Sequence, residues 1–184
     1  VAAMPEDLGR RAQKTLEDLG VEIRLNTRVS NVTSEGVTIG DEVIPAENVL
    51  WAAGVQGQSF TSTLGVELDR AGRIIVGPDL TIPEHPDVFV IGDAAHATDS
   101  KTGQPVPGLA QAAIQEGRFV GQIISTEAKG GANSDRPAFS YRDKGSMAMI
   151  GRGNAIAAIG KVHYGGLLGF LSWNLVHVMF LVGF

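Results

Sequence analysis

The sequence predicts an α/β fold, in which strands and helices alternate along the chain and pack as layers. Three observations support this prediction. Apolar residues recur at helical spacing in two segments, short apolar runs of strand length lie between them, and glycine closes several of these runs. At 184 residues, the chain is long enough for one domain or two small ones.

The amino-terminal segment predicts a helix. Pro5 suits the first helical turn, and the acidic Glu6 and Asp7 suit the positive end of the helix dipole. Leucine and alanine then recur at helical spacing as far as Leu19, and Gly20 follows as a stop signal.

Strand-like segments come next. Residues 21–25 alternate apolar and charged side chains, which predicts a strand, and residues 37–39 and 42–44 flank Gly40-Asp41, which predicts a hairpin. The continuous apolar run 48–54 predicts a strand buried on both faces, with Trp51 as a packing residue.

Two further strands are predicted at residues 73–76 and 86–92, and the second of them runs directly into Asp93. A carboxylate at the carboxyl end of a buried parallel strand points into the crevice where α/β folds bind ligands. Asp93 is therefore a candidate ligand-binding residue. The alternative is that Asp93 only caps residues 94–96, and the sequence favours neither reading.

A second long helix is predicted from about Leu109 to Ser125. Its Gln111 and Gln115 are four residues apart and share one face, and the small alanines between them would let a flat ligand lie close to the backbone. Its amino-terminal N–H groups can stabilise a nearby anion. The alternative is an ordinary amphipathic helix with two solvated glutamines.

Composition excludes several classes of function. The chain has 15 Lys and Arg against 20 Asp and Glu, a net charge of −5, so no basic field would recruit nucleic acid. It has no cysteine, which excludes disulfides, thiol chemistry and thiolate metal sites, and we predict no metal site. No G-x-G-x-x-G follows a predicted strand, so the sequence shows no complete nucleotide-binding unit.

The end of the sequence is apolar. Lys161 is the last charged residue, and residues 164–184 predict a helix about as long as a bilayer is thick. Glycine, serine, Asn174 and His177 dilute its hydrophobicity, so we favour a helix lying in one leaflet at the membrane surface. A buried dimerisation helix is the next alternative and a spanning helix the third. Both ends of the sequence look cut, and we expect a fragment of a longer protein.

Four motifs occur in order along the chain, and together they resemble one known family. They are L-W-A-A-G-V at 50–55, V-F-V-I-G-D-A-A at 88–95, G-L-A-Q-A-A-I-Q-E-G at 108–117 and Y-R-D-K-G-S-M-A-M-I-G-R at 141–152. Over essentially its whole length, the chain resembles the carboxy-terminal half of a type II NADH dehydrogenase, the single-subunit, non-proton-pumping NADH:quinone oxidoreductase. The resemblance implies a partial two-dinucleotide-binding, Rossmann-like flavoprotein fold with a small antiparallel hairpin and a helical membrane-anchoring region.

The resemblance also implies roles for individual residues in binding the two cofactors, FAD and NADH. Asp93 would bind the ribityl chain of FAD, with Gly92 giving backbone clearance. The turn at Gly54 and Val55 would lie near the nicotinamide of NADH. Tyr141 is interpreted as a packing residue.

A quinone pocket is implied beside the flavin ring. Ala110 and Gln111 would lie at the ring edge, and Gln111, Ala113 and Gln115 would border the quinone, which the two amides would orient. Lys161 matches a family lysine near the quinone, with a solvated or headgroup-contacting lysine as the alternative.

The implied domains are residues 1–80, from the NADH-binding domain, residues 81–128, from the FAD-binding domain, and residues 129–184, a membrane-associated region. Electrons would pass from NADH through FAD to a membrane quinone, on a peripheral protein at the cytoplasmic face of a bacterial plasma membrane. The sequence does not decide whether the protein forms a homodimer.

The family's glycine-rich FAD and NADH loops are both missing, so we predict that the chain alone binds FAD and NADH poorly and is inactive. Other reductases of the same fold and a non-catalytic docking or dimerisation module are the alternatives. A sulfide:quinone oxidoreductase would need cysteines, which this sequence lacks.

Overall fold

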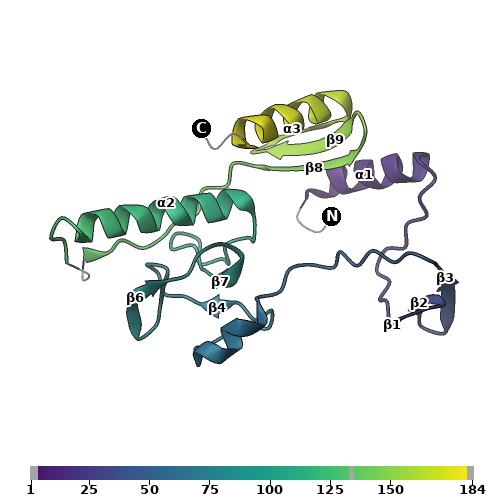
Figure 1. Cartoon of the computed structure of the whole chain (residues 1–184). Coiled ribbons are helices and arrows are strands. Elements are labelled where there is room, and N and C mark those ends of the chain that lie inside the picture. The colour runs from purple at the N-terminus through teal and green to yellow at the C-terminus, as the bar shows by residue number, and fades with distance from the viewer. Residues whose placement is uncertain (1–3, 133–134, 182–184) are drawn as a thin grey trace. The chain divides into compact units, whose positions relative to one another are not determined.

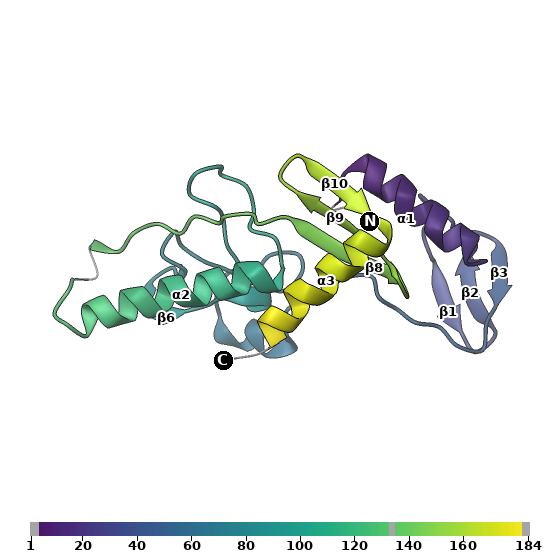
Figure 2. The same cartoon turned by 90° about the horizontal axis from the view of Figure 1, so that it is seen from above.

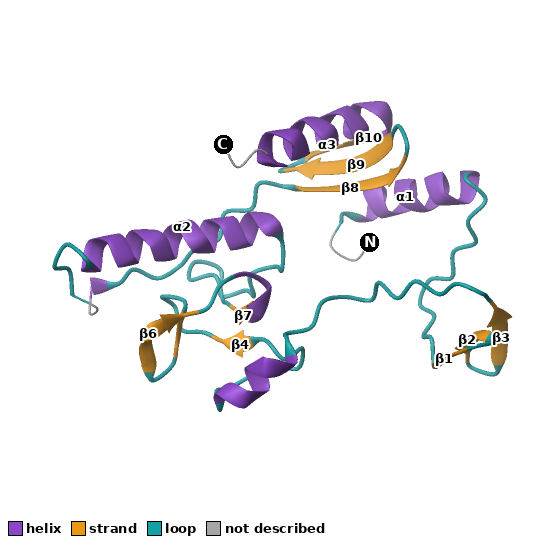
Figure 3. Ribbon diagram, viewed as in Figure 1, coloured by secondary structure: helices purple, strands orange, loops and turns teal. Residues whose placement is uncertain are grey.

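The computed structural model describes residues 4–132 and 135–181. These residues form two compact units, of which unit 1 combines residues 4–51 with residues 144–181 and unit 2 combines residues 52–132 with residues 135–143. Figure 3 distinguishes the helices from the short strands. The helices are α1 (Glu6–Asp18), α2 (Ala110–Glu127) and α3 (Gly166–Leu181), with 3-10 turns at Ser59–Leu64 and Gly92–Ala94.

Unit 1 is built around an antiparallel sheet of three strands, in the order β10-β9-β8. Alternate residues of a strand face opposite sides of the sheet, and the residues that face α1 are apolar. Leu8 and Ala12 of α1 pack there against Ile156 and Ala158. Figure 1 shows α3 on the other side of this sheet, and Ala155 and Ala157 are fully buried. The strands are β8 (Ser146–Gly151), β9 (Asn154–Ile159) and β10 (Val162–Gly165).

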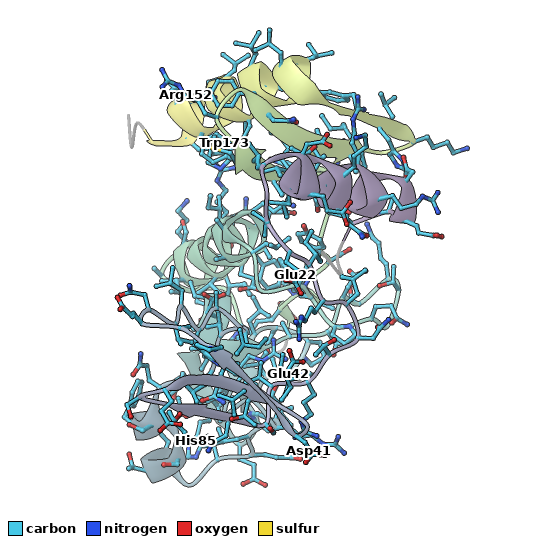
Figure 4. All side chains as sticks on the ribbon, turned by 90° about the vertical axis from the view of Figure 1, so that its right-hand side faces the viewer. Glu22, Asp41, Glu42, His85, Arg152 and Trp173 are labelled. Carbon is cyan, nitrogen blue, oxygen red and sulfur yellow. The ribbon has the colours of Figure 1, made fainter. Side chains whose placement is uncertain are left out.

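The predicted hairpin is confirmed in unit 1. Strands β2 (Gly36–Ile39) and β3 (Glu42–Pro45) pair antiparallel, and β1 (Asn31–Thr33) adds a third strand on the side of β2. Gly40 has a φ of 60°, which glycine adopts without steric cost, and Asp41 follows it at the turn (Figure 4).

Unit 2 places α2 over small sheets and a shared apolar core (Figure 1). Ala112 and Val120 of α2 are buried in this core, whose other members are Leu80, Ala97, Val106 and Phe139. Tyr141 packs against it, as predicted. The strands are β4 (Ile74–Ile75), parallel to β7 (Ala95–His96), and β5 (Thr81–Ile82), antiparallel to β6 (His85–Phe89).

Three strand predictions are wrong: two of the segments form no strand, and the third forms a strand with other bounds and another pairing. Residues 21–25 and 48–54 form no strand, and no neighbouring strand of the described residues pairs with their backbone groups. Leu50 is consequently 95% exposed, and Trp51 is exposed rather than packed. The predicted buried parallel strand at 86–92 is instead β6, which pairs antiparallel with β5, ends at Phe89 and is largely exposed.

The carboxy-terminal helix prediction is confirmed for α3, and residues 182–184 of that prediction lie outside the described residues. Figure 2 shows that α3, seen from above, runs across the direction of the strands of this sheet. None of the helices in the described part of the chain is long and apolar enough to cross a bilayer. Residues 139–159, which no pattern assigned, contain β8 and β9.

Candidate functional site

The chain turns sharply just after β6. The backbone N–H of Val90 donates to the carbonyl of Leu80 at 2.9 Å, and the chain then enters the 3-10 turn Gly92–Ala94. Gly92 has a φ of 67°, a region that favours glycine. A β-carbon on Gly92 would also lie 3.4 Å from the side chain of Ala113 on α2. The turn therefore lies against α2, and the positive φ favours glycine at position 92.

The carboxylate of Asp93 lies at the surface of this turn. Its side chain is exposed, and a β-carbon on Gly108 would lie 3.4 Å from Asp93 Oδ1. Asp93 thus lies beside the segment that leads into α2. The exposed Asp93 carboxylate can accept hydrogen bonds from a ligand.

The amino terminus of α2 follows directly. Leu109, the residue before the helix, gives it no side-chain cap, and the first turn contains no acidic residue. The positive end of the helix dipole is consequently not neutralised within the helix itself. Ala110, Gln111 and Ala113 all lie in this first turn, and Ala113 faces Gly92 of the 3-10 turn.

Gln115 is engaged by the backbone of Arg142. Its Nε2 donates to the Arg142 carbonyl at 3.0 Å, and its Oε1 accepts from the Arg142 N–H, also at 3.0 Å. The same Nε2 donates to the Gln111 carbonyl at 3.1 Å. The predicted contact between Gln115 and a quinone stays a prediction, but the amide already has a structural partner.

Residues 139–142, which include the start of the fourth sequence motif, bond to α2 and to the loop at Asp99. The backbone N–H of Tyr141 donates to Asp99 Oδ1 at 3.0 Å, and Ser100 donates to the carbonyl of Phe139. The hydrogen bond from Thr102 to Asp99, with further backbone donors, holds the pKa of Asp99 at about 2. We call residues 139–142 the strap, because Asp99 and Gln115 tie it to two different parts of unit 2.

The other predicted site residues lie elsewhere. Gly54 has a φ of 117° and lies with the exposed Val55 in an extended segment of unit 2. Lys161 is an exposed residue in the turn between β9 and β10, and belongs to unit 1. The described residues contain no group of His, Asp and Glu arranged to hold a metal ion.

Comparison with known proteins identifies relatives of this chain. A family model for pyridine nucleotide-disulphide oxidoreductases matches residues 1–117. The type II NADH:quinone oxidoreductase Ndh of Mycobacterium tuberculosis is 40% identical over 98% of this chain. A type II NADH:quinone oxidoreductase of Staphylococcus haemolyticus is 33% identical over 84% of it. The chain spans about 40% of the length of these curated relatives.

Solved structures share the fold. NDH2 from Plasmodium falciparum, in complex with NADH, superimposes on 99% of this chain with a TM-score of 0.83 at 14% identity, and the match covers 52% of that protein. The sulfide:quinone oxidoreductase of Aquifex aeolicus superimposes on 94% of the chain with a TM-score of 0.67 at 17% identity, and covers 44% of that protein. These matches confirm the predicted α/β flavoprotein-type fold with its small antiparallel sheets.

Proposed function

Because this chain belongs to the pyridine nucleotide-disulphide oxidoreductase family, we propose that it forms the flavin- and quinone-facing part of a type II NADH:quinone oxidoreductase. The observation that carries this proposal is the exposed Asp93 carboxylate, which follows a tight glycine turn beside the uncapped end of α2. The curated relatives are oxidoreductases of this type, and the chain corresponds to about 40% of their length. The complete activity would therefore also need the part of such a protein that this chain does not match.

The residues of the turn fit FAD. The turn contains Gly92, and the small residues Gly108 and Ala113 lie beside it. A side chain added at Gly92 would reach Ala113, and one added at Gly108 would reach Asp93. Such a surface gives a flat, multi-ring ligand close access to backbone. When bound, FAD would accept a hydride from NADH and pass two electrons to the quinone.

The residues of this chain would bind and orient the FAD. Asp93 would accept hydrogen bonds from ribityl hydroxyls, because its exposed carboxylate lies beside the segment that leads into α2. The N–H groups at the start of α2, at Ala110 and Gln111, would stabilise negative charge on the edge of the flavin ring.

The quinone would bind next to the first turns of α2. We place Ala110, Gln111 and Ala113 at the border of the quinone pocket, where the alanines leave room for a flat ring and Gln111 orients the ring carbonyl. Gln115 would border the same pocket and fix the strap through its bonds to Arg142. Because amides do not titrate, Gln111 and Gln115 would orient the quinone without supplying its protons. The contact of Lys161 with a quinone or a lipid headgroup stays a prediction.

The NADH contact would come from the turn at Gly54 and Val55. The high positive φ of Gly54 brings backbone to the surface without a side chain, as close contact with a nicotinamide ring requires. We assign the NADH-binding contribution to residues 1–80, the FAD-binding one to residues 81–128 and the membrane-associated one to residues 129–184.

The third region would lie at the membrane surface through α3. Its outward residues are apolar and exposed, and the helix has no acidic residue in its first turn and no basic residue in its last. The polar side chains of Asn174 and His177 hydrogen-bond to carbonyls of their own helix, at Phe170 and Trp173. A helix that satisfies its own polar groups is suited to lipid. We place it on the cytoplasmic leaflet, with a homodimer as the alternative occupant of this face.

The test uses a fusion protein, in which this chain is joined to the part of the Mycobacterium tuberculosis relative that the match does not cover. The fusion should purify with stoichiometric flavin absorbance and oxidise NADH only when quinone is supplied. Asp93→Ala should weaken FAD binding about ten- to hundredfold, because a hydrogen bond to a charged group contributes roughly 1.5–3 kcal/mol. Asp87→Ala, at an exposed aspartate of β6, is the matched control. A colourless fusion, or equal FAD binding by both variants, would contradict the proposal.

A further inference from the structure

Glu116 is a buried carboxyl group directly beneath the Gly92–Ala94 turn. It lies on α2 and is only 3% exposed. Its Oε2 accepts a hydrogen bond from the backbone N–H of Gly92 at 2.5 Å. Among the described residues, no Lys, Arg or His forms an ion pair with it. Burial raises the pKa of Glu116, and the neighbouring Asp93 carboxylate raises it further.

A charged side chain is rarely buried without a partner of opposite charge. The hydrogen bond from the Gly92 N–H accounts for the buried position of the Glu116 carboxyl. The Gly92 N–H belongs to the residue that gives the turn its positive φ, and Asp93 is the next residue along the chain. Fixing this N–H fixes the point from which the Asp93 side chain departs.

The helix and the turn are also packed closely around this bond. A β-carbon on Gly117 would lie 3.6 Å from Ile91 Cδ1, and one on Gly92 would lie 3.4 Å from Ala113. The hydrogen bond of Glu116 thus joins the turn to α2 where the two segments are also in van der Waals reach of each other.

We propose that Glu116 is a positioning residue of the FAD site: its side-chain oxygen fixes the Gly92–Asp93 turn at a set distance from the amino terminus of α2. The essential property is an acceptor oxygen at the full length of a glutamate side chain, and not the negative charge. The role in FAD binding rests on the proposed function, whereas the hydrogen bond to Gly92 belongs to this chain alone.

Two substitutions distinguish the role of the Glu116 acceptor oxygen from the role of its negative charge. Glu116→Gln keeps an oxygen at the same reach and removes the charge, whereas Glu116→Asp keeps the charge and withdraws the oxygen by one methylene. The first measurement is hydrogen–deuterium exchange at the Gly92 amide of this chain, followed by NMR. We expect exchange in Glu116→Gln to stay within about threefold of the unsubstituted chain, and exchange in Glu116→Asp to be at least about tenfold faster.

Gln122→Asn is the control, because it shortens an exposed side chain of the same helix by one methylene. It should leave exchange at Gly92 unchanged. The proposal is overturned if Gly92 stays protected in Glu116→Asp, or if Glu116→Gln loses protection. Should Glu116→Asp fail to fold, the Glu116→Gln result decides alone, since a neutral acceptor must preserve the protection.

The second measurement is FAD affinity in the fusion described above. Glu116→Gln should bind FAD with unchanged affinity, and Glu116→Asp should bind it about tenfold more weakly or worse. Equal affinities for the two variants would overturn the role in FAD binding. A fusion that binds no FAD in any form would contradict the proposed function instead, while exchange at Gly92 would still test the positioning of the turn.

Discussion

Asp99 shows how one carboxylate can hold a segment in place. It is buried, and it accepts hydrogen bonds from Thr102 and from the backbone of Lys101 and Tyr141. These donors favour its charged form, and its pKa falls from the ordinary value of 3.8 to about 2. Because the pKa is lower in the folded chain, the unfolded chain binds more protons between these values.

The stability that Asp99 contributes should therefore be complete above about pH 4 and disappear as the pH falls towards 2. Measured by urea unfolding across this range, Asp99→Asn should show a shallower loss of stability than the unsubstituted chain, since the amide has no charge to lose. Equal slopes for the two proteins would show that Asp99 is not responsible.

Gln115 connects α2 to the strap through both atoms of its amide. Gln115→Glu would keep the acceptor and remove the two donated hydrogen bonds, and it would place a carboxylate against the carbonyls of Arg142 and Gln111. We expect a loss of about 1–3 kcal/mol in the free energy of unfolding, as for other unpaired polar groups. Gln122→Glu makes the same change on an exposed part of α2 and should be nearly neutral. Equal effects would argue against the contact.

At the scale of the elements, α3 approaches β9 closely because residue 169 is glycine. A β-carbon there would lie 2.5 Å from the Ala155 carbonyl oxygen, which belongs to backbone that cannot move away easily. Gly169→Ala should therefore destabilise unit 1 by about 1–3 kcal/mol, as overpacking does elsewhere.

Gly9→Ala is the matched control for this prediction. Gly9 lies within α1, and an added β-carbon meets no atom within 4 Å. This substitution should stabilise the chain by about 0.5–1 kcal/mol, because alanine loses less entropy than glycine in a helix. Thermal unfolding of the two variants should consequently shift in opposite directions, and shifts in the same direction would contradict the close packing of α3 on β9.

The elements that could be predicted from sequence are those with local signals. Helix α1 has acidic residues in its first turn and a regular apolar spacing, and the β2–β3 hairpin has Gly40 at its turn. The segment 48–54 was predicted wrongly because an apolar run reports a tendency to be buried, but a strand also needs a neighbour for its backbone groups. Its exposed Leu50 shows that no such neighbour is present in the described residues.

The site was predictable only in part, for a related reason. Asp93 and Gln111 could be singled out because each stands in a short motif. The contacts that hold them could not, because Glu116 bonds to a residue 24 positions away, Gln115 to one 27 positions away, and Asp99 to one 42 positions away. No local periodicity reports a hydrogen bond between such distant residues.

At the scale of the whole molecule, the apolar surface of α3 predicts association with lipid. Val178 is 58% exposed on this helix, and Val43 is 49% exposed on the β2–β3 hairpin. Val178→Glu should reduce binding to uncharged phosphatidylcholine vesicles about tenfold or more, because it places a charge in the lipid-facing surface. Val43→Glu makes the same change away from α3 and should have no effect. If Val178→Glu instead separates a dimer and leaves vesicle binding unchanged, α3 is a subunit interface.

Unit 1 is assembled from both ends of the sequence, with all of unit 2 between its two parts. During synthesis on a ribosome, α1 emerges before β8 and β9, the strands of the sheet against which it packs in unit 1. Unit 2 is continuous and can fold in the meantime. Until β8 and β9 have been translated, the apolar side of α1 lacks this packing partner, and this interval is when a nascent chain of this protein would most need a chaperone.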